Sequence, residues 1–132
     1  MSELPRRRFL DLVGAAPNYI APGCTISGDI ETSDPVVVCG YVRGDGKITA
    51  ALSMARGSVW EGEVHAREAV ISGRMTGKLV IAGKLEIRST AVLRADVVAG
   101  SIAIAKGAVV EGDLQVANGK PIVEFEEKRG AR

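Results

Sequence analysis

The sequence predicts an all-β fold, a single-domain parallel β-helix with about six coils of roughly 17 residues, from three observations. A short pattern recurs six times, with centres 16, 18, 15, 18 and 17 residues apart. Apolar and small residues alternate with polar residues inside the copies, which is typical of strands. The period is too short for a βαβ unit, whose crossover alone needs about a dozen residues. Three short strands per coil, stacked with a triangular cross-section, satisfy all three observations.

Each repeat is centred on a small residue and has a large apolar residue two positions earlier. The centres are Gly28, Gly44, Gly62, Gly77, Ala95 and Gly112. The apolar residues before them are Ile26, Val42, Trp60, Met75, Leu93 and Val110. Residues two positions after the centres are also apolar, except Gly46. Since alternate side chains of a strand share one face, we expect these residues in the core, where the indole N–H of Trp60 needs a partner.

A second strand precedes each centre, and a tight turn connects the two strands. In four coils an apolar residue leads into a three-residue turn, and three of these turns end in glycine, at Gly23, Gly57 and Gly107. Glycine adopts positive φ without steric cost, which suits such turns. Two shorter coils, around 36–38 and 69–71, omit part of the turn. We therefore expect coil length to vary at this corner.

The 132 residues are expected to form one domain with a tail at each end. Residues 18–118 carry the repeats and are expected to form the β-helix domain. Residues 1–17 are expected to be a flexible tail that either caps the first coil or contacts a membrane. Residues 119–132 are expected to be a flexible charged tail.

The N-terminal segment contains a short run of basic and apolar residues. The residues expected to contact a membrane are Arg6, Arg7, Arg8, Phe9 and Leu10. Arginines beside apolar side chains favour weak binding to an anionic lipid surface. A twin-arginine export signal fits poorly, because Asp11 and Pro17 interrupt the apolar stretch that should follow.

Charge, cysteine and histidine content predict no catalytic residue, no cofactor site and no metal site. The net charge is +1 and both signs are interspersed, so no nucleic-acid partner is expected. The residue after each centre is mostly acidic, and a solvated stripe is favoured there over a cation site. Cys24 and Cys39 form no metal or redox motif, and parity places them on opposite faces, which argues against a disulfide. His65, the only histidine, is expected on the surface.

The terminal coils are as apolar as the middle ones, and a β-helix leaves unpaired strand edges at both ends. Such edges predict that copies of the chain stack end to end into filaments without a nucleotide. The residues expected to form these contacts are Tyr19, Ile20, Ile26, Ile30, Ile102, Ile104, Val110 and Leu114.

The repeat region resembles the bactofilin family in order over residues 18–117. The segments that carry the resemblance are 19–30, 38–45, 69–77, 85–91 and 107–113. The resemblance implies a right-handed β-helix that polymerises into nonpolar, nucleotide-independent bacterial cytoskeletal filaments. It also implies a cytoplasmic protein, peripheral at the inner face of the cytoplasmic membrane, that positions cell-wall synthesis or hydrolysis enzymes or polarity proteins. Three residues depart from the family pattern: Ala95 replaces a glycine, Gly46 an aliphatic residue and Val110 an aromatic residue.

Two other functions are compatible with a β-helix. One is a hexapeptide-repeat-like acyltransferase with His65 as the base. That class needs apolar residues every six positions and coils of 18 residues, and the spacings of 16, 15 and 17 break this phase. The other is a passive membrane-bound scaffold that stays a small oligomer.

Overall fold

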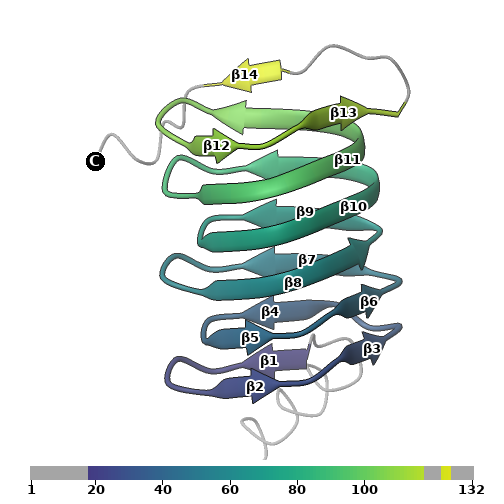
Figure 1. Cartoon of the computed structure of the whole chain (residues 1–132), viewed down its shortest axis with the longest axis vertical. Coiled ribbons are helices and arrows are strands. Elements are labelled where there is room, and N and C mark those ends of the chain that lie inside the picture. The colour runs from purple at the N-terminus through teal and green to yellow at the C-terminus, as the bar shows by residue number, and fades with distance from the viewer. Residues whose placement is uncertain (1–17, 118–122, 126–132) are drawn as a thin grey trace, which may run out of the picture.

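The computed structural model describes residues 18–117 and 123–125, and every regular element in them is a β-strand. The 14 strands form one continuous sheet that winds around a core, and successive coils lie one above another (Figure 1). Strands at the front of Figure 1 run from left to right and those at the back run from right to left as the chain climbs, so the coil is right-handed. The predicted single-domain parallel β-helix is confirmed.

Each coil has three strand segments, one on each of three faces. The first face holds β1 (Asn18–Ile20), β4 (Val36–Val38), β7 (Ala51–Met54), β9 (Glu68–Ile71), and the later parts of β10 (Arg74–Ile87) and β11 (Val92–Ala105). The second and third faces hold β2 (Thr25–Ser27), β3 (Ile30–Thr32), β5 (Tyr41–Arg43), β6 (Gly46–Ile48), β12 (Val109–Glu111) and β13 (Leu114–Val116). In the middle coils β8 (Val59–Ala66), β10 and β11 run across both of these faces without a break.

The backbone register reproduces the predicted alignment of the six repeats. The column before the centres pairs in parallel as Ile26, Val42, Trp60, Met75, Leu93 and Val110. Coil length varies at the predicted corner between the first and second faces. It also varies at a second corner, because the register of β10 and β11 shifts between Ile81 and Lys84, where two residues of one coil face Gly100 of the next.

The predicted glycine turns have the expected backbone. Gly23, Gly57 and Gly107 have φ of 86°, 87° and 103°. The residue after each glycine donates its N–H to a carbonyl oxygen three residues earlier; the N···O distance from Ser58 to Ala55, for example, is 3.0 Å. These turns place the first and second faces of a coil at an angle and keep their inward positions in phase.

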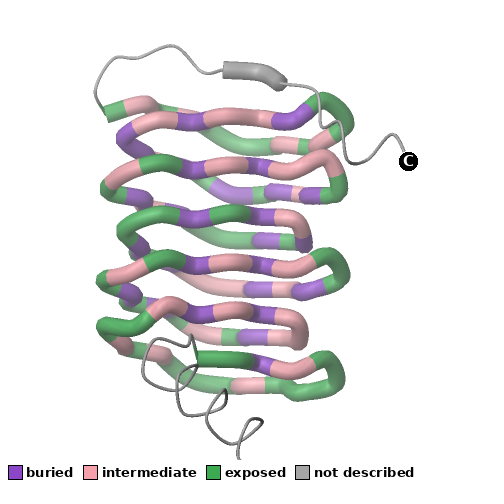
Figure 2. The backbone as a smooth tube through the Cα atoms, turned by 180° about the vertical axis from the view of Figure 1, so that it is seen from behind, coloured by how far each residue is buried: buried purple, intermediate pink, exposed green. Residues whose placement is uncertain are grey.

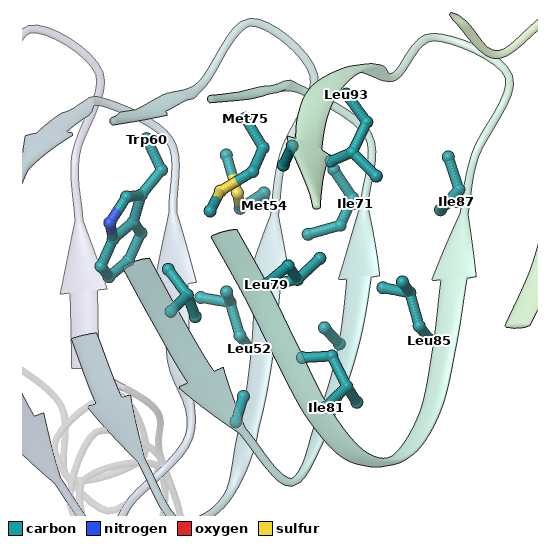
Figure 3. Packing of buried hydrophobic residues seen from close by; sticks show 14 of the residues in the cluster. Leu52, Met54, Trp60, Ile71, Met75, Leu79, Ile81, Leu85, Ile87 and Leu93 are labelled. Atoms are coloured by element: carbon teal, nitrogen blue, oxygen red, sulfur yellow. The ribbon is translucent and has the colours of Figure 1, made fainter. Parts of the chain in front are cut away.

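The core is a set of apolar columns that run along the solenoid axis. Figure 3 shows side chains from all three faces meeting between the strands, including Trp60, Met75 and Leu79. Along the middle coils, buried residues alternate with more exposed ones (Figure 2). Residues 21–35 and 106–117, by contrast, contain no fully buried residue. Core residues are therefore fully buried in the middle coils and only partly buried towards both ends.

Trp60 occupies space that Gly46 of the preceding coil leaves free. The indole is completely buried, and its Nε1–H donates to the carbonyl oxygen of Gly44 at 2.9 Å. A Cβ on Gly46 would lie 2.6 Å from Cζ2 and 2.8 Å from Cη2 of Trp60. Gly46 stands where the pattern has an aliphatic residue, and its missing side chain leaves the space that the only tryptophan of the chain occupies.

The central glycines let successive coils approach closely. Gly77 has φ of 128°, and a Cβ there would lie 2.2 Å from the carbonyl oxygen of Gly62 in the coil below. Ala95 is the exception in this column. Since no residue other than glycine has positive φ in the described chain, the backbone at Ala95 takes an ordinary conformation, and its methyl group is buried at 5% exposure.

We predict that Gly46→Val lowers the free energy of unfolding by about 2 kcal/mol, because it overpacks the core against Trp60. In a Trp60→Leu background the same substitution should be better tolerated, giving a coupling energy of about 1 kcal/mol or more in a double-mutant cycle. Urea unfolding followed by circular dichroism measures both effects. Lys47→Val, at the exposed neighbouring position, is the control. Equal destabilisation by Gly46→Val in the two backgrounds contradicts the proposed packing.

We also predict that Gly77→Ala lowers the free energy of unfolding by about 2 kcal/mol or more, because alanine is strained at positive φ and its Cβ meets a carbonyl oxygen. The reverse change in the next coil, Ala95→Gly, should lower it by only about 1 kcal/mol, through added flexibility and a lost methyl group. Thermal unfolding of the two variants provides the comparison. If both changes are equally destabilising, the two positions do not differ in backbone conformation as described.

Candidate assembly surfaces at the ends of the solenoid

Each end of the solenoid presents aliphatic side chains that belong to the core columns. At the N-terminal end these are Ile26 of β2 and Ile30 of β3, which are half-buried against the core. At the C-terminal end they are Val110 of β12 together with Leu114 and Val116 of β13, which are half-buried in the same way. Their counterparts in the middle coils are fully buried, so the exposure at the ends comes from the missing neighbouring coil.

The strands at the two ends also have one free edge each. β1, β2 and β3 pair only with β4, β5 and β6, and β12 and β13 pair only with β11. A strand edge of this kind offers unpaired N–H and C=O groups to another chain. Free edges and half-buried aliphatic side chains therefore coincide at both ends of the described chain.

The structure separates the eight residues that the sequence singled out for contacts between copies. Ile26, Ile30, Val110 and Leu114 lie at the ends, and Ile104 is half-buried in the last coil. Ile20 and Ile102 belong to the core, at 5% and 1% exposure. Tyr19 is 62% exposed, but it alternates with the inward Ile20 and so lies on the outer side of the first face. Two end residues were missed, Ala108 and Val116, although the two-residue alternation from Val110 and Leu114 points to both.

The C-terminal end carries a further strand that the sequence did not predict. β14 (Val123–Phe125) pairs in parallel with the end of β11 and begins a seventh coil on the first face (Figure 1). Its register joins Ala103 to Val123, Ile104 to Glu124 and Ala105 to Phe125. Part of the segment expected to be a tail, 119–132, therefore extends the ladder.

The acidic column beside the centres links successive coils by hydrogen bonds. Asp29 Oδ1 accepts the backbone N–H of Asp45 at 3.1 Å, and Asp45 Oδ1 accepts that of Glu63 at 3.0 Å. Asp96 Oδ1 accepts the N–H of Asp113 at 3.3 Å. These carboxylates satisfy backbone donors next to the central residues. Within residues 18–117 no group of three or more His, Cys, Asp or Glu side chains is arranged to hold a metal ion.

His65 lies on the outer side of β8, as predicted, with 52% of its side chain exposed. Its Nε2 is 2.5 Å from Oε2 of Glu63, and this hydrogen bond lowers the pKa of the Glu63 carboxyl. The pair borders an open groove of about 520 Å³ that is also lined by Asp29, Asp45 and Lys47. The arrangement is an exposed hydrogen-bonded pair of side chains on the flank of the solenoid.

Two further sequence predictions concern thiols and lipid contact. Cys24 is exposed and Cys39 half-buried, and both are free thiols. The segment with Arg6, Arg7, Arg8, Phe9 and Leu10 lies outside the residues that the structure describes. Across 18–117 and 123–125 there is no helix with the length and apolar character needed to span a membrane.

Comparison with known proteins identifies the solenoid. The family model of the bactofilins, described as polymer-forming cytoskeletal, matches residues 18–115. Bactofilin BacO of Myxococcus xanthus (strain DK1622) is 28% identical over 101 residues, which cover 76% of this chain and 80% of BacO. None of the solved structures compared with the chain matches it. Because the family match spans most of the chain and coincides with the six stacked coils, this protein belongs to the bactofilin family of polymer-forming cytoskeletal proteins.

Proposed function

We propose that this chain is a bacterial cytoskeletal scaffold whose copies join end to end into nucleotide-independent filaments. The observation that carries the proposal is the coincidence, at both ends, of open core columns with free strand edges. A second copy seated on either end would bury the aliphatic side chains there and extend the hydrogen-bonded ladder. Membership of a polymer-forming family supports this use of the ends.

The energetics predict that each end-to-end contact, here called a joint, is weak. Full burial of an aliphatic side chain contributes roughly 1.5–3 kcal/mol, and Ile26, Ile30, Val110, Leu114 and Val116 each have only part of that to gain. Association also loses translational and rotational freedom. Filaments joined by such short end surfaces are therefore expected to lengthen as the protein concentration rises, without a nucleotide to drive assembly.

We further propose that the filaments lie at the inner face of the cytoplasmic membrane and position cell-wall synthesis or hydrolysis enzymes or polarity proteins. The support is the N-terminal run Arg6-Arg7-Arg8-Phe9-Leu10, which combines positive charge with apolar side chains. One such segment binds anionic lipid weakly, but many copies on a filament add avidity. Attachment of this kind leaves the sides of the solenoid free for partner proteins.

An acyltransferase with His65 as the base has less support. The register follows coils of 15 to 18 residues, whereas a hexapeptide repeat keeps one phase. His65 is hydrogen-bonded to Glu63 on an exposed surface. An acetyl-transfer assay with the purified protein tests this alternative, and the scaffold proposal expects no turnover.

End-to-end assembly is tested by placing an arginine in the core column at one end or the other. Ile26→Arg or Leu114→Arg buries a charge in any joint at that end, so each should abolish filaments in electron micrographs. Nonpolar filaments have like-to-like joints, so each single variant should stop at dimers and the double variant at monomers in light scattering.

The matched controls for this test are Ser27→Arg and Gln115→Arg, which add the same charge at exposed neighbouring positions and should leave filaments intact. Filaments that persist in both core-column variants contradict the proposal. Monomers from either single variant, instead of dimers, would show that the joints are head to tail.

The lipid contact is tested by replacing Arg6, Arg7 and Arg8 with alanine together. Each arginine near an anionic surface contributes about 1 kcal/mol, so binding to vesicles rich in phosphatidylglycerol should fall about 100-fold. Co-sedimentation with vesicles measures the change. The matched control removes three positive charges from the other tail, at Lys128, Arg129 and Arg132. If both triple variants lose binding equally, the net charge of the chain determines lipid binding, and the N-terminal segment has no specific part in it.

A further inference from the structure

An open groove lies on the face of the solenoid that is formed by β3, β6 and the adjoining parts of β8 and β10. One part of it, with a volume of about 520 Å³, is lined by four carboxylates, those of Asp29, Glu31, Asp45 and Glu63. The other part, with a volume of about 370 Å³, is lined mainly by apolar side chains, those of Ile48, Ala66, Val80 and Ala82. We call these the acidic part and the apolar part. Lys47 and His65 border both, so the two parts adjoin.

The apolar part interrupts a column of charged and polar side chains. The outward column of this face reads, in the order of the coils, Glu31, Lys47, His65 and Val80. Val80 is half-buried, and Ala82, two positions further along β10, is exposed. Apolar side chains rimmed by polar ones mark surfaces that contact a partner. The groove therefore suits an occupant with cations at one end and apolar side chains at the other.

The segment that leads into β1 has this pattern in its sequence. Residues 6–8 are three arginines, and residues 9–13 read Phe-Leu-Asp-Leu-Val. The arginines complement the carboxylates of the acidic part, and the four apolar residues complement the apolar part. The carboxylate of Asp11 complements Lys47 and Arg67, which border the apolar part. The order of charged and apolar residues in the segment thus matches the order of the two parts of the groove.

The chain enters the solenoid beside the groove. Asn18, the first residue of β1, donates its Nδ2–H to Oγ1 of Thr32 at 3.1 Å, and Thr32 follows directly on Glu31 of the acidic part. Ten residues lead from Arg8 to Asn18, and an extended chain of that length spans about 33 Å. From β3 to β10 the groove rises by three coil spacings, or about 14 Å. Residues 6–13 are therefore close enough along the chain to reach both parts.

We propose that the groove holds residues 6–13 of its own chain, with the arginines at the carboxylates and the apolar side chains beside Val80 and Ala82. The groove and an anionic lipid surface then compete for one segment. Docking lowers the apparent affinity for lipid in proportion to the fraction of chains that are docked, so a protein away from the membrane keeps its lipid contact covered. The competition rests on the membrane contact proposed above, whereas docking in the groove does not.

Docking is tested by cleavage of the full chain with trypsin, which cuts after arginine. Cleavage at residues 6–8 follows the undocked fraction, and mass spectrometry measures its rate. Val80→Glu places a charge in the apolar part and should speed this cleavage about 10-fold. Val98→Glu, at the same position one coil further and outside the groove, is the matched control. Glu31→Gln should also speed cleavage, by a smaller factor, while Glu68→Gln on the first face should not.

The competition is tested by co-sedimentation with vesicles rich in phosphatidylglycerol. Val80→Glu should bind them about 10-fold more tightly than the unchanged protein, because the segment is no longer held in the groove. Val98→Glu adds the same charge and should bind like the unchanged protein. When residues 6–8 are all replaced by alanine, adding Val80→Glu should change nothing. Thermal unfolding shows that each solenoid is intact, and Ala82→Glu, at an exposed position of the groove, takes the place of Val80→Glu if that variant unfolds.

Docking is overturned if cleavage at residues 6–8 is equally fast in the unchanged protein and in Val80→Glu, or if Val98→Glu speeds it as much. Protection that is lost on dilution also overturns it, because the segment would then occupy the groove of another copy. If Val80→Glu speeds cleavage but neither protein binds vesicles, docking holds and the membrane contact proposed above is wrong. If both bind vesicles equally well, the competition between groove and lipid is wrong.

Discussion

The constraint on which the structure depends is that every coil needs a neighbour on both sides. The backbone of one coil is hydrogen-bonded to the next, and the register places each core residue beside its equivalent one coil away. In the middle of the chain both neighbours are present, and residues such as Val42 and Leu79 are completely buried. Among the described residues, the first coil has no neighbour on one side and the sixth coil has only β14 there. The construction that stabilises the middle coils therefore leaves strand edges and aliphatic side chains partly exposed at both ends of the described chain.

The sequence predicted the parts of this fold that follow from alternation along a strand. Alignment on the small central residues matched the backbone register at all five steps between coils, because inward and outward positions keep their phase within each strand. The same alternation correctly placed Trp60 in the core and His65 on the surface. The glycine turns were also predictable, because positive φ is a local property of the residue.

The sequence could not supply what depends on contacts between coils. Alternation predicts that Ile20 and Ile102 face inward. Their exposure depends on how the neighbouring residues pack, and both are buried. The sequence predicted the acidic column only as a solvated stripe, and the structure adds that three of its carboxylates accept backbone N–H groups of the next coil. β14 was missed because it carries no copy of the repeat, and its pairing with β11 joins segments that the repeat pattern does not relate.

The seat of Trp60 against Gly46 gives the protein an internal spectroscopic reporter. The chain contains one tryptophan, and its indole is sealed in the third coil and hydrogen-bonded to the second. Its fluorescence therefore responds to separation of those two coils, and the buried indole lies in the core and not on either end surface. If the tryptophan emission stays constant while filaments grow, intact solenoids have joined. If the emission changes, the coils around Trp60 have rearranged during assembly.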